Sequence, residues 1–153
     1  MKLRKFLKLL FNCKTFILVL VFIYVNFCIT NCEMCVIDGD SMLPTLYNKQ
    51  IVFIDKNPKY FYKNEIVVVN NNGMIIKRIK GVEGDAYYTT QDPTMYILDK
   101  VMIEFNGKEF EHFVKKKIPH DYYYILGDNQ ANSYDSKFFG LVSKKQIVGV
   151  VYK

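Results

Sequence analysis

Three short blocks of this 153-residue chain place polar side chains among turn-forming residues, where a strand pattern would predict neither. The first block runs from Asp38 to Leu46. In it, Ser41 follows a Gly-Asp turn and precedes a segment stiffened by Pro44, which can hold the serine hydroxyl clear of a strand. A lone serine in a turn is ordinarily only a turn residue, so this block becomes informative only beside a base.

The second block, residues 74–85, contains a lysine in a strand-like run. Alternation along a strand puts Ile75, Lys77 and Ile79 on one face. If that face is buried, the Lys77 amine is desolvated, its pKa falls, and it can act as a general base. The alternative is an edge-strand lysine in water, but Arg78 and Lys80 can serve as the solvated charges instead.

The third block, residues 127–142, is dense in Asp, Asn and Ser and includes Asp128, Ser133 and Asp135. Such side chains hydrogen-bond to nearby backbone, which predicts a loop that bonds to itself. An ordinary surface turn would look the same. The two histidines offer no better base, because His112 lies in an irregular stretch and His120 beside a proline turn.

The elements that must position these blocks are mostly short β-strands. Runs of β-branched or aromatic residues separated by Asn, Gly, Pro and Asp predict the strands 34–37, 50–54, 65–69, 74–76, 122–126 and 146–151, with one short helical turn near 44–46. The stretch 86–120 is less regular and predicts a small inserted lobe, with residues 115–117 (Lys-Lys-Lys) as a solvated turn. We therefore expect one catalytic domain over residues 33–153.

The N-terminal region has the pattern of a membrane anchor. Residues 1–14 carry five cations, and removing these from the 21 in the chain leaves 16 against 15 acidic residues. A basic head on a balanced body favours membrane orientation over nucleic-acid binding. Residues 15–32 are uncharged and would span about 27 Å as a helix. A cleaved signal is the alternative, but the segment 27–31 offers a poor cleavage site, so we expect a retained transmembrane anchor.

All four cysteines lie in or beside this segment. Cys32 and Cys35 have the spacing of a redox pair, but no thioredoxin-like pattern surrounds them, and one pair without histidines is a poor zinc site. We expect them to be apolar filler, with an opportunistic disulfide as the alternative. No metal and no cofactor is expected.

Taken in this order after an anchor, the three blocks resemble the type I signal peptidases, and the likeness covers the whole chain. It rests on Ser-Met-x-Pro-Thr at residues 41–45, Lys-Arg-x-x-Gly-x-x-Gly-Asp at 77–85, and Gly-Asp-Asn with Asn-Ser-x-Asp-Ser at 127–136. The resemblance implies a mostly β fold, an antiparallel β-sheet catalytic domain with a small inserted lobe behind one transmembrane helix.

The resemblance also implies roles for individual residues. Ser41 would be the nucleophile and Lys77 the general base, as in other Ser-Lys pairs. Ser133 would hold the lysine amine, and Asp135 would pair with Arg78. Gly39 and Asp128 would support the catalytic pair. The substrate-binding residues would be Cys35, Val36, Ile37, Asp38, Met74, Ile75 and Ile76.

Some positions distinguish this chain within the family it resembles. Gly39 stands where a serine is also found, so the oxyanion hole would rely on the Ser41 backbone N–H. Gln130 and Lys137 stand where Arg is frequent. Lys137 keeps the positive charge but lacks the bidentate fork of arginine, which would loosen the brace with Asp135. Lysine rather than histidine as the base points to the bacterial or organellar branch.

The implied activity is cleavage of signal (leader) peptides after small residues (Ala-x-Ala), by a serine-type endopeptidase whose substrates pair with strands 35–41 and 73–77. Its partners would be signal-peptide-bearing precursors and the lipid bilayer. We expect a single-pass plasma-membrane protein with a cytoplasmic N-terminus, or alternatively a mitochondrial inner-membrane one. Two alternatives are a conjugation-specific or self-cleaving repressor-like Ser-Lys peptidase and a non-catalytic leader-binding membrane protein.

Overall fold

The computed structural model describes residues 13–90, 96–97 and 113–152. The chain divides into two compact units, Met1–Glu33 and Met34–Lys153. The basic residues of segment 1–12 and the middle of the expected lobe, including His112, lie outside the described residues.

The first unit is formed by helix α2, Cys13–Asn31. From Phe16 to Val25 every residue is at least 45% exposed. All of these side chains are apolar except for the hydroxyl group of Tyr24. Its polar side chains bond back along the helix, for example Thr30 Oγ1 to the Asn26 carbonyl at 2.9 Å. Among the described residues, no helix combines the length and the apolar character needed to cross a membrane.

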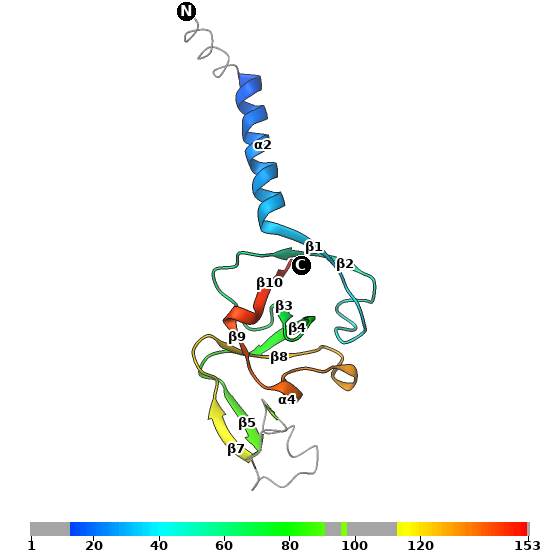
Figure 1. The fold of residues 1–153 in the computed structure, drawn as a ribbon, viewed down its shortest axis with the longest axis vertical. Helices are drawn as coiled ribbons and strands as arrows, with labels where there is room; N and C mark the ends of the chain where they lie inside the picture. The colour runs from blue at the N-terminus through cyan, green and yellow to red at the C-terminus, as the bar shows by residue number, and fades with distance from the viewer. Residues whose placement is uncertain (1–12, 91–95, 98–112, 153) are drawn as a thin grey trace, which may run out of the picture. The chain divides into compact units, whose positions relative to one another are not determined.

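The second unit is built on a seven-stranded sheet with the order β1-β2-β10-β3-β4-β8-β9 (Figure 1). The neighbours from β2 through to β9 pair antiparallel. The strands are β1 Cys32–Val36, β2 Ile51–Asp55, β3 Ile66–Asn70, β4 Met74–Gly81, β8 Tyr122–Leu126, β9 Val142–Ser143 and β10 Ile147–Val151. The expected mostly β, antiparallel architecture is therefore confirmed.

Three short helices lie between the last strands. They are the 3-10 helix η2 (Gln130–Asn132), the α-helix α4 (Ser136–Phe139) and the 3-10 helix η3 (Lys144–Gln146). The segment expected as a lobe contributes a separate three-stranded sheet with the order β6-β5-β7: β5 Ala86–Thr90, β6 Tyr96–Ile97 and β7 Phe113–Lys117. The three-lysine run is exposed as predicted, but the predicted turn is wrong, because Lys115–Lys117 pair with β5 as part of a strand.

Most predicted strands shift by only one or two residues at their ends, and β8 has the predicted limits. The main difference is β4, which continues from the predicted Met74–Ile76 to Gly81. Its first part pairs with β3 and its second part with β8, so strand geometry extends through Lys77, Arg78 and Lys80. Paired neighbours on both sides outweigh the low strand propensity of the charged residues.

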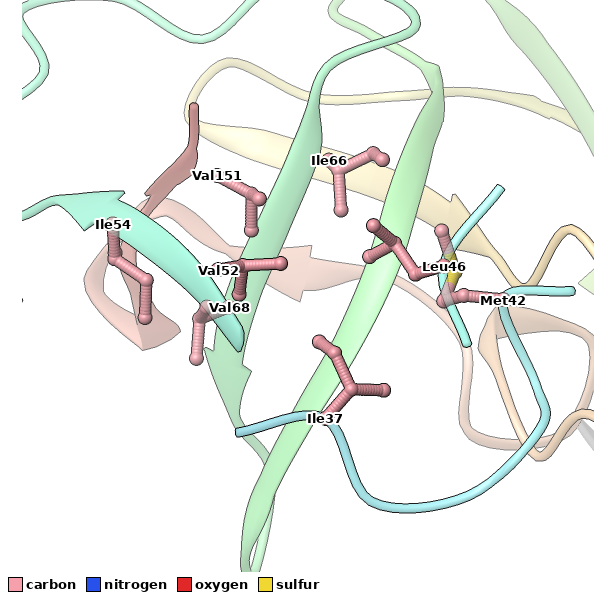
Figure 2. Packing of buried hydrophobic residues seen from close by; sticks show 8 residues of the cluster. All are labelled: Ile37, Met42, Leu46, Val52, Ile54, Ile66, Val68 and Val151. Atoms are coloured by element: carbon pink, nitrogen blue, oxygen red, sulfur yellow. The ribbon is translucent and has the colours of Figure 1, made fainter. Parts of the chain in front are cut away.

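The core includes one cluster on each face of the central strands, and a third cluster contains Tyr87, Ile118 and Tyr124. On β3, Ile66 and Val68 belong to the first cluster, and Val67 and Val69 to the second, so all four are buried. Figure 2 shows the first cluster, which is formed by Ile37, Met42, Leu46, Val52, Ile54, Ile66, Val68 and Val151. The second includes Val67, Val69, Ile79, Ile125 and Val142. Strand β4 thus lies in an interior that is apolar on both faces.

Candidate active site

Ser41 lies at the start of a tight turn that the core holds in place. The Leu43 N–H donates to the Asp40 carbonyl at 3.2 Å, and the N–H groups of Thr45 and Leu46 donate to Met42. Met42 and Leu46 are 2% and 6% exposed and pack into the first cluster (Figure 2). The predicted short turn at 44–46 is therefore present, and its apolar anchors leave Ser41 at its edge.

Gly39, two residues before Ser41, has φ of +94°. L-residues other than glycine rarely adopt this conformation, so the backbone here favours glycine over a side chain. Its N–H donates to Asn48 Oδ1 at 3.2 Å. Gly39 thus allows the backbone to turn just before Ser41, but it provides no side-chain hydrogen-bond donor near the Ser41 hydroxyl.

Lys77 is the buried partner of Ser41. Its side chain is 4% exposed, and Nζ lies 2.8 Å from Ser41 Oγ and 3.0 Å from the Ile76 carbonyl oxygen. The alternation prediction is confirmed, since Ile75 and Ile79 on the same face belong to the second cluster, whereas Ile76 packs on the first. Burial lowers the pKa of Lys77, and the Asp135 carboxylate acts in the opposite direction.

This geometry suits proton transfer from a hydroxyl to an amine. A neutral lysine nitrogen has a lone pair, and at 2.8 Å it can accept the Ser41 proton without further movement. The ammonium form is disfavoured because the surroundings are apolar and supply few compensating charges. The two residues are 36 positions apart in the chain, so only the fold brings them together.

The loop after β8 closes the other side of the site. Gly127 approaches so closely that a Cβ there would lie 2.2 Å from Ser133 Oγ and 2.6 Å from the Ser41 carbonyl oxygen. A larger residue would push the loop away from the nucleophile turn. The Ser133 hydroxyl is buried and has no hydrogen-bond partner in the described part of the chain. The predicted bond from Ser133 to the Lys77 amine is therefore absent.

Asp135 is fully buried and organises this loop through backbone N–H groups. One carboxylate oxygen accepts from the Lys137 N–H at 3.1 Å, which caps α4, and the other accepts from the Gly127 N–H at 3.1 Å. The predicted pairing of Asp135 with Arg78 is wrong. The Lys137 amine also turns elsewhere, to the Gln130 carbonyl at 3.2 Å.

Arg78 pairs instead with Asp128. Its Nε and Nη2 donate to the two carboxylate oxygens at 2.8 and 2.5 Å, and Nη1 donates to the Asn64 carbonyl at 2.7 Å. Nη2 also lies 3.3 Å from Thr45 Oγ1 in the nucleophile turn. The arginine is only 9% exposed, so its predicted role as a solvated charge is wrong. The planar guanidinium fork matches the two carboxylate oxygens of Asp128, and this bidentate pairing compensates for burial.

Two further residues contribute that sequence reasoning did not single out. Asn129 bonds to the nucleophile turn, through its backbone N–H to the Ser41 carbonyl and its side chain to Asp40. Ser136 Oγ accepts the Ile125 N–H at 2.9 Å inside the core. The density of Asn and Ser in the third block was the feature that could have indicated these two residues. That density predicted hydrogen bonds within the loop, and it does not identify partners elsewhere in the chain.

The predicted substrate strands differ in what they offer. Residues 74–78 of β4 pair with β3, while β8 pairs with β4 only from Arg78 onward, so no described strand covers the second edge of Met74–Ile76. In the other segment, Val36 and Asp38 are exposed and Cys35 is half-buried. Ile37 is 3% exposed, and its N–H and carbonyl already pair with Gln50 and Lys49.

Other candidate chemistry finds less support. His120 is exposed and pairs with Glu83 at 2.6 Å, whereas the described hydrogen bonds of Lys77 go to Ser41 and Ile76. In the described ranges no three His, Cys, Asp or Glu side chains gather as a metal site. Cys32 and Cys35 are free thiols, half-buried on β1.

The buried Arg78–Asp128 pair predicts a stability effect. Replacing Asp128 with Asn leaves the arginine charge without its counter-charge, and we expect a loss of about 3 kcal/mol in the free energy of unfolding. Chemical denaturation of the full chain in mild detergent measures this. The matched control is Asp38→Asn, which breaks the exposed Asp38–Lys49 pair and should leave the midpoint unchanged. Equal effects in both variants would contradict the structural role of the buried pair.

Comparison with known proteins shows which family the chain is similar to. The family model described as signal peptidase, peptidase S26, matches residues 10–152. Signal peptidase I S of Bacillus subtilis (strain 168) is 39% identical over 132 residues, 74% of this chain and 71% of that protein. Signal peptidase I of Bacillus amyloliquefaciens is 37% identical over 74% and 70%, and signal peptidase I P of Bacillus subtilis subsp. natto is 33% identical over 87% and 80%. The chain therefore belongs to the signal peptidase family, peptidase S26.

Proposed function

We propose that this chain is a signal peptidase, a serine endopeptidase that cleaves signal peptides from exported precursor proteins. The observation that carries this proposal is the buried Lys77 amine 2.8 Å from the Ser41 hydroxyl. Bacterial relatives named signal peptidase I support the same activity. Their bacterial origin favours the plasma membrane over the mitochondrial inner membrane as the site of action.

In the proposed mechanism Lys77 takes the hydroxyl proton while Ser41 Oγ bonds to the scissile carbonyl carbon. The carbonyl electron pair moves onto oxygen, giving a tetrahedral oxyanion. When the carbonyl re-forms, the C–N bond breaks and the leaving amine takes the proton from Lys77. Water then attacks the acyl ester with Lys77 again as base, which releases the signal peptide and restores Ser41.

The oxyanion needs hydrogen-bond donors, and the Ser41 backbone N–H is the nearest candidate. Gly39 has no side chain to assist it, in agreement with the expectation from the sequence. We assign this stabilisation to the N–H together with any water admitted beside it. The site therefore depends strongly on the orientation of one peptide group.

The substrate would bind as an extended strand along the free edge of Met74–Ile76, with Val36 and Asp38 on its other side. Main-chain bonds would provide affinity that does not depend on sequence. Ile37 has already paired its backbone groups, so it would contribute its side chain, beside Ile76 in the first cluster. Such a closely packed apolar surface favours small residues before the cut, as in Ala-x-Ala.

We further propose that the N-terminal segment, α2 together with the residues that precede it in the sequence, attaches the enzyme to the membrane as a single-pass anchor with a cytoplasmic N-terminus. The support is the unbroken exposed apolar surface of Phe16–Val25, which water would not tolerate well. The five cations of the preceding residues favour the cytoplasmic side. Anchoring would hold enzyme and precursor in the same plane and raise their effective concentration.

The catalytic pair is tested by substitution. Ser41→Ala removes the nucleophile and Lys77→Ala the base, and we expect each to lower kcat by at least about 1,000-fold. The assay is cleavage of a precursor with an Ala-x-Ala site by detergent-solubilised protein, with Lys80→Ala as the matched control on the same strand. Normal cleavage by Ser41→Ala or by Lys77→Ala would contradict the proposed mechanism. Binding of the precursor without cleavage by the unsubstituted chain would favour the non-catalytic alternative.

The pH dependence of kcat tests the role of the lysine. Lys77 must be neutral to act as a base, so activity should rise with pH on the acidic side. Burial lowers the pKa of Lys77, so this rise should lie below the ordinary lysine pKa of about 10.4.

The Asp135 carboxylate raises the pKa of Lys77, opposing burial. Removing its charge in Asp135→Asn should therefore move the rise in kcat to lower pH. The amide oxygen can still accept one backbone N–H, and thermal unfolding checks that the variant is folded. A flat profile, or a rise displaced to higher pH in Asp135→Asn, would contradict a lysine base in this environment.

Membrane attachment is tested by extraction of cell membranes with alkaline carbonate. The full chain should stay in the membrane pellet, and the double variant Leu18→Lys with Phe22→Lys should be released, because charges at a helix centre are costly in a bilayer. The control places the same two lysines at Thr30 and Asn31, where they can reach the interface. Release of the unsubstituted chain would contradict the anchor.

A further inference from the structure

The nucleophile turn and the loop after β8 are joined by one residue, Asn129. Its backbone N–H donates to the Ser41 carbonyl oxygen at 2.9 Å, and its side-chain Nδ2 donates to the Asp40 carbonyl oxygen at 3.1 Å. Because a carbonyl only accepts, the orientation of the Asn129 amide is fixed by its partner. These two carbonyls belong to consecutive peptide groups.

Those peptide groups lie on either side of the Ser41 Cα. The Asp40 carbonyl and the Ser41 N–H share one plane, and the Ser41 carbonyl lies in the next. Holding both planes leaves little freedom for the two backbone dihedral angles of Ser41. These angles set the direction of the Ser41 side chain, which must point its hydroxyl at the Lys77 amine.

The same bond controls the backbone donor. In a trans peptide the N–H points opposite to the carbonyl of the same plane, so a donor held on the Asp40 oxygen also aims the Ser41 N–H. Hydrogen bonding to that oxygen polarises the peptide group and strengthens its N–H as a donor. No side-chain donor stands at Gly39 to compensate for a misaligned N–H.

We propose that Asn129 is a positioning residue that orients both the Ser41 nucleophile and its oxyanion-stabilising N–H. This inference rests on the proposed Ser41–Lys77 chemistry. Asn129 makes no bond to Lys77 in the described structure, so it acts on the nucleophile and the oxyanion, and leaves the base unchanged. Its side chain is half-exposed, which separates this role from core packing.

The test compares Asn129→Asp and Asn129→Ala with the unsubstituted chain in precursor cleavage. Both keep the backbone N–H that bonds Ser41, and both remove the side-chain donor to Asp40. We expect kcat to fall about tenfold, the order of one lost hydrogen bond in the transition state, with KM within twofold. In Asn129→Ala, which introduces no charge near Lys77, the pH at which kcat rises should not move. Gln130→Ala, at the exposed neighbouring position, is the matched control and should retain full kcat.

A second measurement separates positioning from folding. A peptide aldehyde ending in alanine forms a tetrahedral adduct with the serine and probes the oxyanion directly. Its inhibition constant should rise about tenfold in both Asn129 variants, in parallel with kcat, at an unchanged thermal midpoint. A kcat within twofold of the unsubstituted chain, a displaced pH profile in Asn129→Ala, or a loss explained by a lowered midpoint would each overturn the proposal.

Ser41→Ala, assayed in parallel, keeps the two proposals apart. If it still cleaves, the serine mechanism itself fails. If it is inactive while the Asn129 variants cleave normally, only the positioning role fails.

Discussion

The site depends on keeping a lysine amine out of water. Desolvation favours the neutral form of Lys77, and only the neutral form can take a proton from Ser41. Burying a lysine costs free energy, and the close packing of the apolar residues around it must offset that cost. The strand that carries Lys77 is held by paired strands on both sides. The two core clusters on β3 and β4 provide those surroundings, and Lys77 lies where the nucleophile turn meets them.

The charged groups around Lys77 fit this constraint because most are paired with one another or with backbone. Arg78 faces away from the lysine and is held by Asp128, so its charge is compensated. Asp135 is buried, but its carboxylate is used by two backbone N–H groups in the loop. It remains close enough to raise the pKa of Lys77, which limits how far burial lowers it.

The segment from Gly127 to Asn129 links these parts. Gly127 allows close approach to Ser41, Asp128 holds Arg78 beside Thr45, and Asn129 bonds the peptide groups around Ser41. Three consecutive residues thus contact the nucleophile turn from one side, each through a different chemical group. A displacement of this segment would therefore affect the nucleophile and the arginine together.

The sequence by itself determined most strands of the seven-stranded sheet and the candidate pair. Runs of β-branched and aromatic residues predicted the strands. Alternation predicted the buried face of Lys77, because side-chain direction in a strand follows from local geometry. Motif composition selected Ser41 and Lys77 together with the third block. The partners were decided only by the tertiary structure: Arg78 meets Asp128 and not Asp135, Ser133 forms no bond to the lysine, and Asn129 reaches Asp40. Which carboxylate an arginine pairs with depends on how strands and loops far apart in the chain come together. The spacing of residues along the sequence does not give the distance between them in the folded protein.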